Sequence, residues 1–253
     1  MKGLVAGADD DMTTTPTVAS KVVLGAPRGD SFTAFGRRVE IWTAEIGVPS
    51  SADCLCSEEF ISRADVERAS RIGTPGGRAR FTAGRALTRW ALAAHLGCRP
   101  AEIAITPGRG GKPELADRGS QLRMYERSPE GIDFNLSHSG NQVAVAVARG
   151  LRVGIDIECV IDRDNAADVA SRVFSEAERD LLMRTSPAGY LARWYQIWTM
   201  REAYVKAQGT GLSGIAAELP DSGTSWLAHG VRGVAQGYAA TAVACREDYH
   251  AVE

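Results

Sequence analysis

Apolar and polar side chains alternate most regularly over residues 151–158, Leu-Arg-Val-Gly-Ile-Asp-Ile-Glu. A period of two predicts a β-strand with one face in a core. The valine and isoleucines form the apolar face, and Asp156 and Glu158 lie together on the other face, roughly 7 Å apart. We therefore take this predicted strand as the centre of the chain.

Two carboxylates that lie this close repel each other unless a cation sits between them. Oxygen ligands without a thiolate or imidazole suit Mg²⁺, Mn²⁺ or Ca²⁺. Gly154, on the same face, would let a ligand approach the backbone. The alternative is an edge strand with a solvated acidic face, and this stretch alone favours neither interpretation.

Helical periodicity predicts two long helices, over residues 78–96 and 190–208, each followed by a glycine. Within the second, Trp198, Glu202 and Lys206 recur every four residues and share a face. A solvated Glu–Lys pair would be worth only roughly 0.3–0.5 kcal/mol. The tryptophan indicates instead that this face is packed, which places a third carboxylate and a cation near the interior.

Shorter patterns predict further elements. Strands are expected over 39–44, 102–106 and 142–148, and short helices over 57–60, 63–71 and 174–182. We expect 142–148 to pair with 151–158, which follows it closely. Ser175 is the predicted N-cap of its helix, with Glu178 at the capping-box position. That capping role is a structural alternative to any catalytic role for Glu178.

The expected organisation is a flexible tail at 1–35, an N-terminal half at 36–149 and a C-terminal half with the metal site at 150–253. The tail is rich in Gly, Thr, Asp and Pro without a period. Residues 141–148 and 237–244 are alike, and each follows a long helix that ends at glycine. This similarity suggests two related halves.

Composition narrows the class of protein. The 253 residues are 44% hydrophobic, and a net charge of −2 gives no reason to expect nucleic acid as a partner. No apolar run approaches the ~20 residues that span a bilayer, and the start lacks a signal-peptide pattern. Five cysteines without metal-like spacing suggest reduced thiols in the cytoplasm.

Two loops carry candidate phosphate ligands. Residues 107–113 form a glycine-rich turn with Lys112, but the pattern of a Walker loop is missing. Ser137 and His138 lack the GxSxG context of a nucleophile, and a phosphate-binding pair fits as well. A plain hairpin turn remains the alternative for the first loop.

Five motifs occur in order along the chain. They are Gly111-Lys-Pro113, Asn135-Leu-Ser-His-Ser139, Gly154-Ile-Asp-Ile-Glu158, Phe174-Ser-Glu-Ala-Glu178 and Trp198-Thr-Met-Arg-Glu-Ala-Tyr-Val-Lys206. From about Trp42 onward the chain resembles the Sfp-type 4′-phosphopantetheinyl transferases. One departure is Arg201, where that family usually has lysine.

The resemblance implies an α+β fold of two similar halves related by a pseudo-two-fold axis, with the active site between them. It implies transfer of the phosphopantetheine arm of coenzyme A to a serine of an acyl or peptidyl carrier protein, with release of 3′,5′-ADP. The carrier could serve fatty acid, polyketide or nonribosomal peptide synthesis. We expect the chain to act as a cytoplasmic monomer, without membrane or nucleic acid.

The resemblance also implies residue roles. Asp156, Glu158 and Glu202 would hold Mg²⁺, with Mn²⁺ as a substitute. Glu202 or Glu178 would accept the proton of the carrier serine, and Lys206 would stabilise the departing phosphate. The expected ligands of the nucleotide phosphates are Arg68, Arg80, Lys112, Ser137 and His138.

Two other functions are compatible with the same residues. A metal-dependent phosphohydrolase would use the carboxylates to activate water against coenzyme A-like pyrophosphates. A non-catalytic binding module would carry them only as surface acids. Modification of a carrier protein distinguishes the transferase from both.

Overall fold

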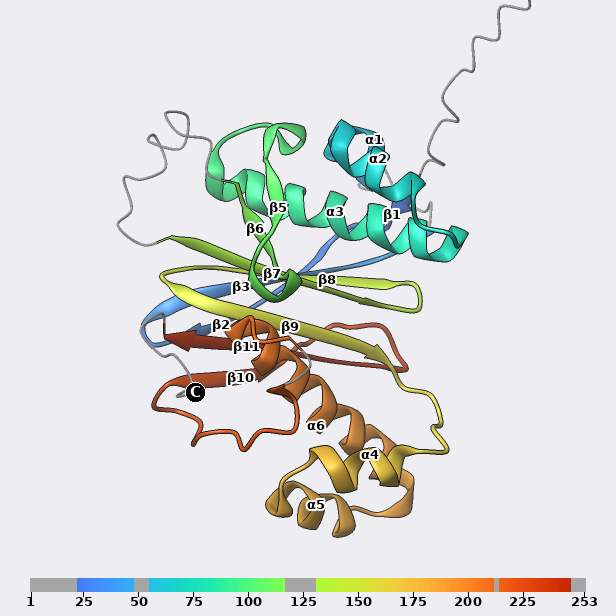
Figure 1. Cartoon of the computed structure of the whole chain (residues 1–253), viewed down its shortest axis with the longest axis vertical. Helices are drawn as coiled ribbons and strands as arrows, with labels where there is room; N and C mark the ends of the chain where they lie inside the picture. Colours follow the sequence, from blue (N-terminus) through green and yellow to red (C-terminus); the bar gives the residue numbers. More distant parts are fainter. Residues whose placement is uncertain (1–21, 48–54, 117–130, 212–213, 247–253) are drawn as a thin grey trace, which may run out of the picture.

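The computed structural model describes residues 22–47, 55–116, 131–211 and 214–246. They form an α+β fold in four layers, with two β-sheets packed face to face and helices on both outer faces (Figure 1). The fold class agrees with the sequence expectation. No helix within these residues is long and apolar enough to cross a membrane.

One sheet has four antiparallel strands and the other has three. The first has the order β2 (Arg28–Ala34), β3 (Arg37–Glu45), β8 (Gln142–Arg149), β7 (Ile132–Ser139). The second has the order β10 (Trp226–Gly230), β11 (Tyr238–Arg246), β9 (Leu151–Cys159). Two small pairs join β1 (Val23–Leu24) to β4 (Leu55–Cys56) and β5 (Ile105–Pro107) to β6 (Pro113–Leu115).

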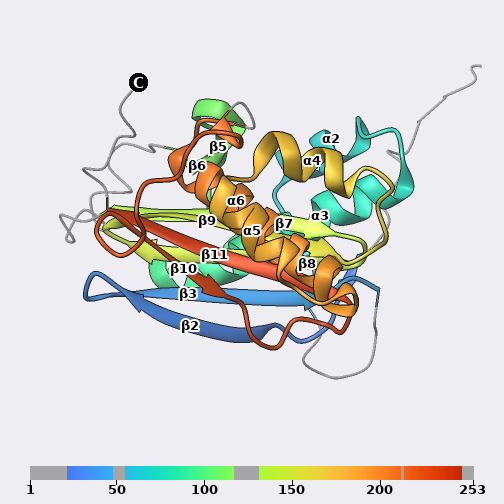
Figure 2. The same ribbon diagram turned by 90° about the horizontal axis from the view of Figure 1, so that it is seen from below.

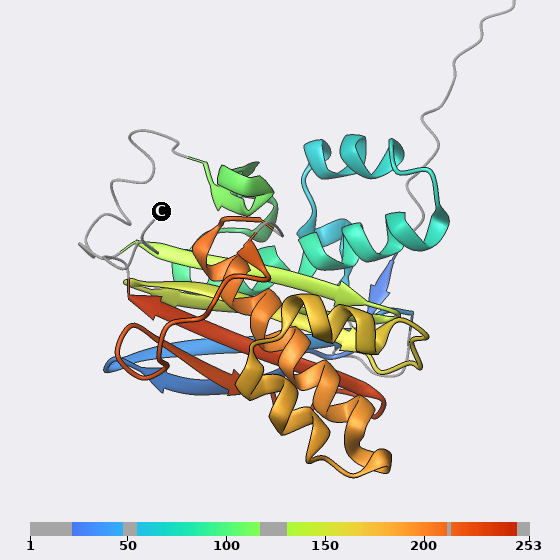
Figure 3. The ribbon, with the colours of Figure 1, turned by 60° about the horizontal axis from the view of Figure 1, so that its bottom comes forward.

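The helices divide between the two outer faces. On the side of the four-stranded sheet, α3 (Pro75–Leu96) packs on the strands, and α1 (Ser57–Phe60) and α2 (Arg63–Ser70) contact α3. Near the three-stranded sheet lie α4 (Ala166–Val173), α5 (Glu176–Met183) and α6 (Pro187–Gln208) (Figure 3). Figure 2 shows α6 lying across that sheet. Short 3₁₀ turns occupy Pro100–Glu102 and Arg109–Gly111.

Both long helices form where the apolar period predicts them. Each helix starts a few residues earlier than expected, with proline in its first turn. Proline lacks a backbone N–H, and the N–H groups of the first turn have no partner within a helix, so proline is tolerated there. Each ends at a left-handed glycine, Gly97 with φ 63° and Gly209 with φ 68°. The predicted capping box of α5 is also confirmed, with Ser175 accepting from the Glu178 N–H.

Three apolar interfaces hold the layers together. Val153, Ile155 and Ile157 of β9 are fully buried between the two sheets, against alanines of β8 and β11. Small alanine side chains allow the sheets to approach closely. Outside the sheets, α3 packs on the four-stranded sheet and α6 on the three-stranded sheet.

The expected pairing of 142–148 with 151–158 is wrong. Strand β8 pairs with β3 and β7, whereas β9 pairs with β11. Gly150, with φ 62°, turns the chain from one sheet to the other. The apolar faces of β8 and β9 therefore meet across the inter-sheet core rather than within one ladder.

The predicted tail at 1–35 is wrong over its last part. Strand β2 pairs with β3 from Arg28 to Ala34, and Leu24 is fully buried. This edge strand has only a weak alternation, because several of its side chains are half-buried or polar. Residues 1–21 lie outside the described residues.

Candidate active site

The two sheets meet along β7 and β9, which lie side by side without a backbone ladder. Alternate side chains of β7 accept hydrogen bonds of 2.7–3.1 Å from backbone N–H groups of β9: Asp133 from Val153, Asn135 from Ile155 and Ser139 from Cys159. Each pair is 20 residues apart in sequence, so the strands run parallel. This junction aligns the motif around Ser137 with the one around Asp156.

Helix α6 lies directly on β9. A Cβ atom at Gly154 would stand 1.9 Å from the Ala203 carbonyl oxygen and 2.6 Å from the Ala207 nitrogen. The glycine is therefore needed for helix packing, which corrects the expectation that it leaves room for a ligand. The close approach brings Glu202 and Lys206 beside Asp156.

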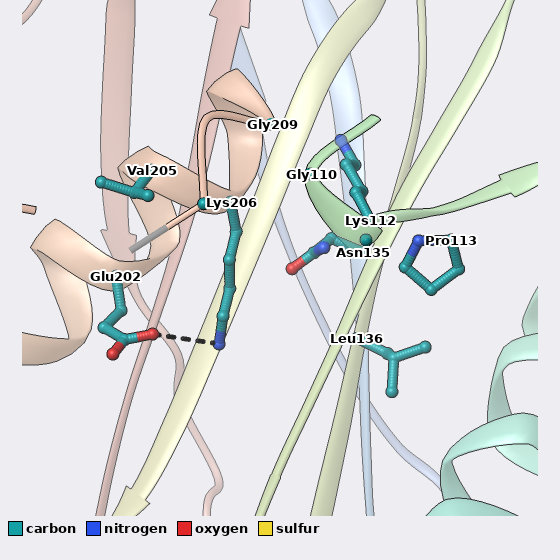
Figure 4. A pocket seen from close by; sticks show the side chains of 11 residues that line it. Gly110, Lys112, Pro113, Asn135, Leu136, Glu202, Val205, Lys206 and Gly209 are labelled. Atoms are coloured by element: carbon teal, nitrogen blue, oxygen red, sulfur yellow. Dashed lines mark ion pairs between the residues drawn. The ribbon is translucent and has the colours of Figure 1, made fainter. Parts of the chain in front are cut away.

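The Lys206 ammonium lies at the centre of the candidate site. Its Nζ atom donates to Asp156 Oδ1 at 2.6 Å and to Ser137 Oγ at 3.3 Å. The Glu202 carboxylate lies 3.6 Å away, and Figure 4 shows this ion pair among the side chains that line a pocket. The side chains of three elements, β7, β9 and α6, thus meet at one cation.

The carboxylates are buried to different degrees. Asp156 is only 2% exposed, and Ser137 Oγ donates to its Oδ1 at 2.8 Å. Its other oxygen, Oδ2, is buried without a hydrogen-bond partner among the described residues. Ser139 Oγ donates to Glu158 at 2.7 Å and orients that carboxylate.

Burial raises the pKa of Glu158 and of Glu202. The charge of Asp156 raises both values further, while Lys206 opposes the shift. Burial also lowers the pKa of His138, and the positive charges of Arg80 and Lys206 lower it further. The site therefore has more negative charge than one lysine stabilises, and its carboxylates favour an added cation.

No group of three or more His, Cys, Asp or Glu side chains is drawn together as a metal cage within the described ranges. The residues nevertheless fit a divalent cation chemically. Hard oxygen donors are what Mg²⁺ and Mn²⁺ prefer, and Asp156 Oδ2 is a buried acceptor that lacks a donor. Asp156, Glu158 and Glu202 are the residues that would hold it.

A pocket of about 360 Å³ opens next to Lys206. One wall is the loop with Gly110 and Lys112, and the other is the end of α6 with Gly209 and Gly211. Gly110, with φ 63°, lies so close to the Gly209 carbonyl oxygen that a Cβ atom would clash at 2.5 Å. The glycines of both loops thus allow the two walls to meet.

Lys112 is less free than the sequence suggests. Its ammonium pairs with Asp133 Oδ2 at 2.5 Å and donates to the Val153 carbonyl oxygen at 2.9 Å. Lys112, predicted above as a phosphate ligand, thus already has two partners within the protein. Its stem still lines the pocket, but its charge is neutralised by the β7–β9 junction (Figure 4).

Glu178 is bound elsewhere. Its carboxylate accepts two hydrogen bonds from Arg201 Nε, at 2.8 and 3.1 Å, and one from the Ser175 N–H at 2.7 Å. Both carboxylate oxygens of Glu178 are therefore engaged within the protein, whereas Glu202 lines the pocket. The geometry thus favours Glu202 over Glu178 as the base.

The remaining predicted phosphate ligands lie on α2 and α3. Arg80 is near enough to His138 for its charge to lower the histidine's pKa. Arg68 stacks over the Phe81 ring at 5.8 Å, with Arg85 over the same ring at 5.4 Å. The described contacts thus link Arg80 to His138 but do not link Arg68 to the pocket.

Sequence reasoning missed Asp133 and Ser139, which orient Lys112 and Glu158. A signal was present in the chain. Asp133, Asn135, Ser137 and Ser139 alternate with apolar or bulky residues, so a polar face of one strand could have been predicted.

An α+β fold that gathers carboxylates, a lysine and hydroxyls beside a pocket has the chemistry of a phosphoryl-transfer enzyme. Comparison with known families agrees. The sequence profile of the 4′-phosphopantetheinyl transferase superfamily matches residues 152–238. The profile described as 4′-phosphopantetheinyl transferase, N-terminal, matches residues 47–149.

Curated relatives extend the match. The 4′-phosphopantetheinyl transferase HetI of Nostoc sp. is 32% identical over 192 residues, which are 74% of this chain and 75% of that protein. A putative 4′-phosphopantetheinyl transferase of Synechocystis sp. is 32% identical over 165 residues, 65% of this chain and 63% of that protein. The Bacillus subtilis 4′-phosphopantetheinyl transferase is 33% identical over 130 residues, which are 51% of this chain and 52% of that protein. This chain belongs to the 4′-phosphopantetheinyl transferase family.

Proposed function

We propose that this enzyme transfers the 4′-phosphopantetheine arm of coenzyme A to a serine of an acyl or peptidyl carrier protein. The products are the holo carrier and 3′,5′-ADP. The observation that carries the proposal is the Lys206 ammonium held between Asp156 and Glu202 beside the pocket. Oxygen charge develops during phosphoryl transfer, and a cation fixed beside it stabilises that charge.

The proposed reaction forms one bond and breaks another. The carrier serine oxygen attacks the phosphorus that bears the pantetheine arm, and the bond from this phosphorus to the bridging oxygen breaks. Glu202, which lines the pocket, accepts the serine proton. The electron pair leaves with 3′,5′-ADP, whose new phosphate charge Lys206 neutralises.

Asp156, Glu158 and Glu202 are proposed to hold Mg²⁺, or Mn²⁺ in its place. A divalent cation held there would supply Lewis-acid stabilisation of negative charge on the substrate's pyrophosphate. Ser137 and Ser139 keep two of the carboxylates in fixed orientations. Arg80 and His138 are the proposed ligands of the 3′-phosphate, with Arg68 and Lys112 as further candidates.

The assembly and setting are also proposals. Side chains from β7, β9 and α6 of one chain complete the described part of the site, so a monomer suffices. Cys98, Cys159 and Cys245 are free thiols, which agrees with a reducing, cytoplasmic setting.

Release of 3′,5′-ADP with and without apo carrier tests the function. The transferase releases it in proportion to carrier, and a carrier whose acceptor serine is changed to alanine gives none. Release at the same rate without carrier would instead support the phosphohydrolase. Comparing carriers of fatty acid, polyketide and nonribosomal peptide synthesis then identifies the acceptor class.

A further inference from the structure

Arg201 and Glu178 form a buried ion pair outside the pocket. The Arg201 residue is 1% exposed and the Glu178 side chain 16%. Arg201 Nη2 lies 2.6 Å from Glu178 Oε2, and Arg201 Nε contacts both carboxylate oxygens. A charge pair buried this deeply is costly to break, because either partner would be left without its counter-charge.

The third arm of the guanidinium reaches a different segment. Arg201 Nη1 donates to the Ile215 carbonyl oxygen at 2.8 Å and to the Ala217 carbonyl oxygen at 3.1 Å. These carbonyls belong to the chain that follows α6 and whose first glycines line the pocket. One side chain therefore contacts two separate parts of the fold at once.

Glu178 has a second structural role. Its carboxylate accepts from the Ser175 N–H and so closes the capping box of α5. The pair thus connects the start of α5, the middle of α6 and the chain after α6. Arg201 directly precedes Glu202, so whatever fixes the rotation of α6 at Arg201 also fixes where Glu202 and Lys206 point.

We infer that the Arg201–Glu178 pair is a positioning clamp for the active site. Its Glu178 arm sets the orientation of Glu202 and Lys206, and its carbonyl arm sets the pocket wall at Gly209 and Gly211. Neither Arg201 nor Glu178 lines the pocket. The effect of the clamp on catalysis rests on the proposed function, whereas the contacts that form the clamp belong to the fold.

Three variants separate the arms. Arg201→Lys keeps a cation for Glu178, but a single ammonium does not reproduce the fork to the two carbonyls. Arg201→Met removes both arms. Arg201→Met/Glu178→Leu removes both charges and fills the space with apolar groups, which restores stability to many buried pairs.

The clamp predicts a graded loss. Arg201→Lys raises KM for coenzyme A about fivefold, because the chain after α6 loses its hydrogen bonds from Nη1, and kcat stays near that of the wild type. Arg201→Met lowers kcat roughly 10- to 100-fold through misplacement of the site. The double variant regains the melting temperature lost by Arg201→Met but not kcat.

Arg89→Met is the matched control for Arg201→Met. Arg89 is also a buried arginine, 2% exposed, that pairs with Asp65 and donates to backbone carbonyls, but it lies on α3. It should lower the melting temperature and leave kcat at saturating coenzyme A unchanged. An equal fall of kcat in the control would show that lost stability, not positioning, explains the Arg201 variants.

The clamp would be overturned by any one of three further results. The first is wild-type kcat in the double variant, because the site would then be ordered without the pair. The second is an unchanged KM for coenzyme A in Arg201→Lys, which has the same force even if the double variant does not fold. The third is complete loss of transfer in Glu178→Gln at every pH, since glutamine still accepts from Arg201 and only a catalytic base would be lost.

The clamp can also be tested if the proposed transferase function is wrong. If the wild type modifies no carrier, binding of coenzyme A measured by calorimetry replaces the kinetic readout. The clamp then predicts about fivefold weaker binding in Arg201→Lys and unchanged binding in Glu178→Gln. Equal binding in all three proteins would overturn the clamp independently of carrier modification.

Discussion

Lys206 Nζ and Asp156 Oδ1 lie 2.6 Å apart, so the lysine neutralises the carboxylate that the sequence assigns to a metal. The same ammonium is proposed to stabilise the departing phosphate. A lysine and a divalent cation at one carboxylate oppose each other electrostatically. Lys206 therefore links metal affinity to phosphate stabilisation.

Lys206→Met is expected to have opposite effects on these two properties. Removing a positive charge next to Asp156 should tighten Mn²⁺ binding, used as the probe, at least about threefold. Transfer should fall at least about 100-fold, since the phosphate loses its cation. Mn²⁺ affinity is followed by water proton relaxation, with Lys112→Met as the control, because that lysine pairs with Asp133 instead. Weaker Mn²⁺ binding in Lys206→Met would contradict the assignment.

Asp156→Ala should abolish transfer and weaken Mg²⁺ binding. Glu158→Ala should be milder, because a water molecule can replace one ligand of Mg²⁺. Initial rates over a Mg²⁺ titration test both variants. Near-normal activity of Asp156→Ala that still depends on Mg²⁺ would place the metal elsewhere.

Dephospho-coenzyme A, which lacks the 3′-phosphate, should be a poorer substrate. Each lost contact to a charged group costs ~1.5–3 kcal/mol, largely as a higher KM. Lys112 is already paired with Asp133, so Arg80 and His138 are the better candidates for binding the 3′-phosphate. Arg80→Gln should lose most of the preference for coenzyme A. An undiminished preference in that variant would remove Arg80 from the phosphate site.

Asp30 should make stability fall in acid. Burial opposes its ionisation, but hydrogen bonds from Arg232, His229 and Ser31 hold its pKa well below the usual value. A depressed folded-state pKa gives stability that is present above the unfolded value near 3.8 and lost as pH falls below it. Asp30→Asn should therefore cost ~1–3 kcal/mol at pH 7 and progressively less below about pH 4. Urea unfolding of the wild type and Asp30→Asn, at pH 7 and below about pH 4, measures the difference in their free energies of unfolding. An equal difference at the two pH values would refute the prediction.

Removal of residues 1–35 should destabilise the enzyme, contrary to the expectation from composition. The deletion takes away β1, β2 and Asp30, which joins β2 to His229 at 2.8 Å and to Arg232. Deletion of 1–21 is the matched control, since it removes none of the described strands. Equal melting temperatures for the two deletions would show that β2 is dispensable.

Patterns of neighbouring residues were enough to predict the features that depend only on the local sequence. The alternation over β9 identified its buried face, and glycine at 97 and 209 marked the ends of both long helices. The face shared by Glu202 and Lys206 follows from helical spacing alone, and the structure confirms their contact at 3.6 Å.

Long-range partners could not be predicted in this way. The sheet that a strand joins depends on tertiary packing, so proximity in sequence misled the pairing of β8 with β9. Lys112 and Asp133 are 21 residues apart, and no spacing rule connects them. Gly154 was expected to leave room for a ligand because the residues that cover it, Ala203 and Ala207 of α6, come 49 and 53 positions later in the chain.

The most direct test of the central claim is the intact mass of a purified apo carrier protein after incubation with this enzyme, coenzyme A and Mg²⁺. The account predicts a gain of one phosphopantetheine per carrier, absent with Asp156→Ala and absent when the acceptor serine of the carrier is replaced by alanine. An unchanged carrier mass while coenzyme A is cleaved would contradict the transferase and favour hydrolysis.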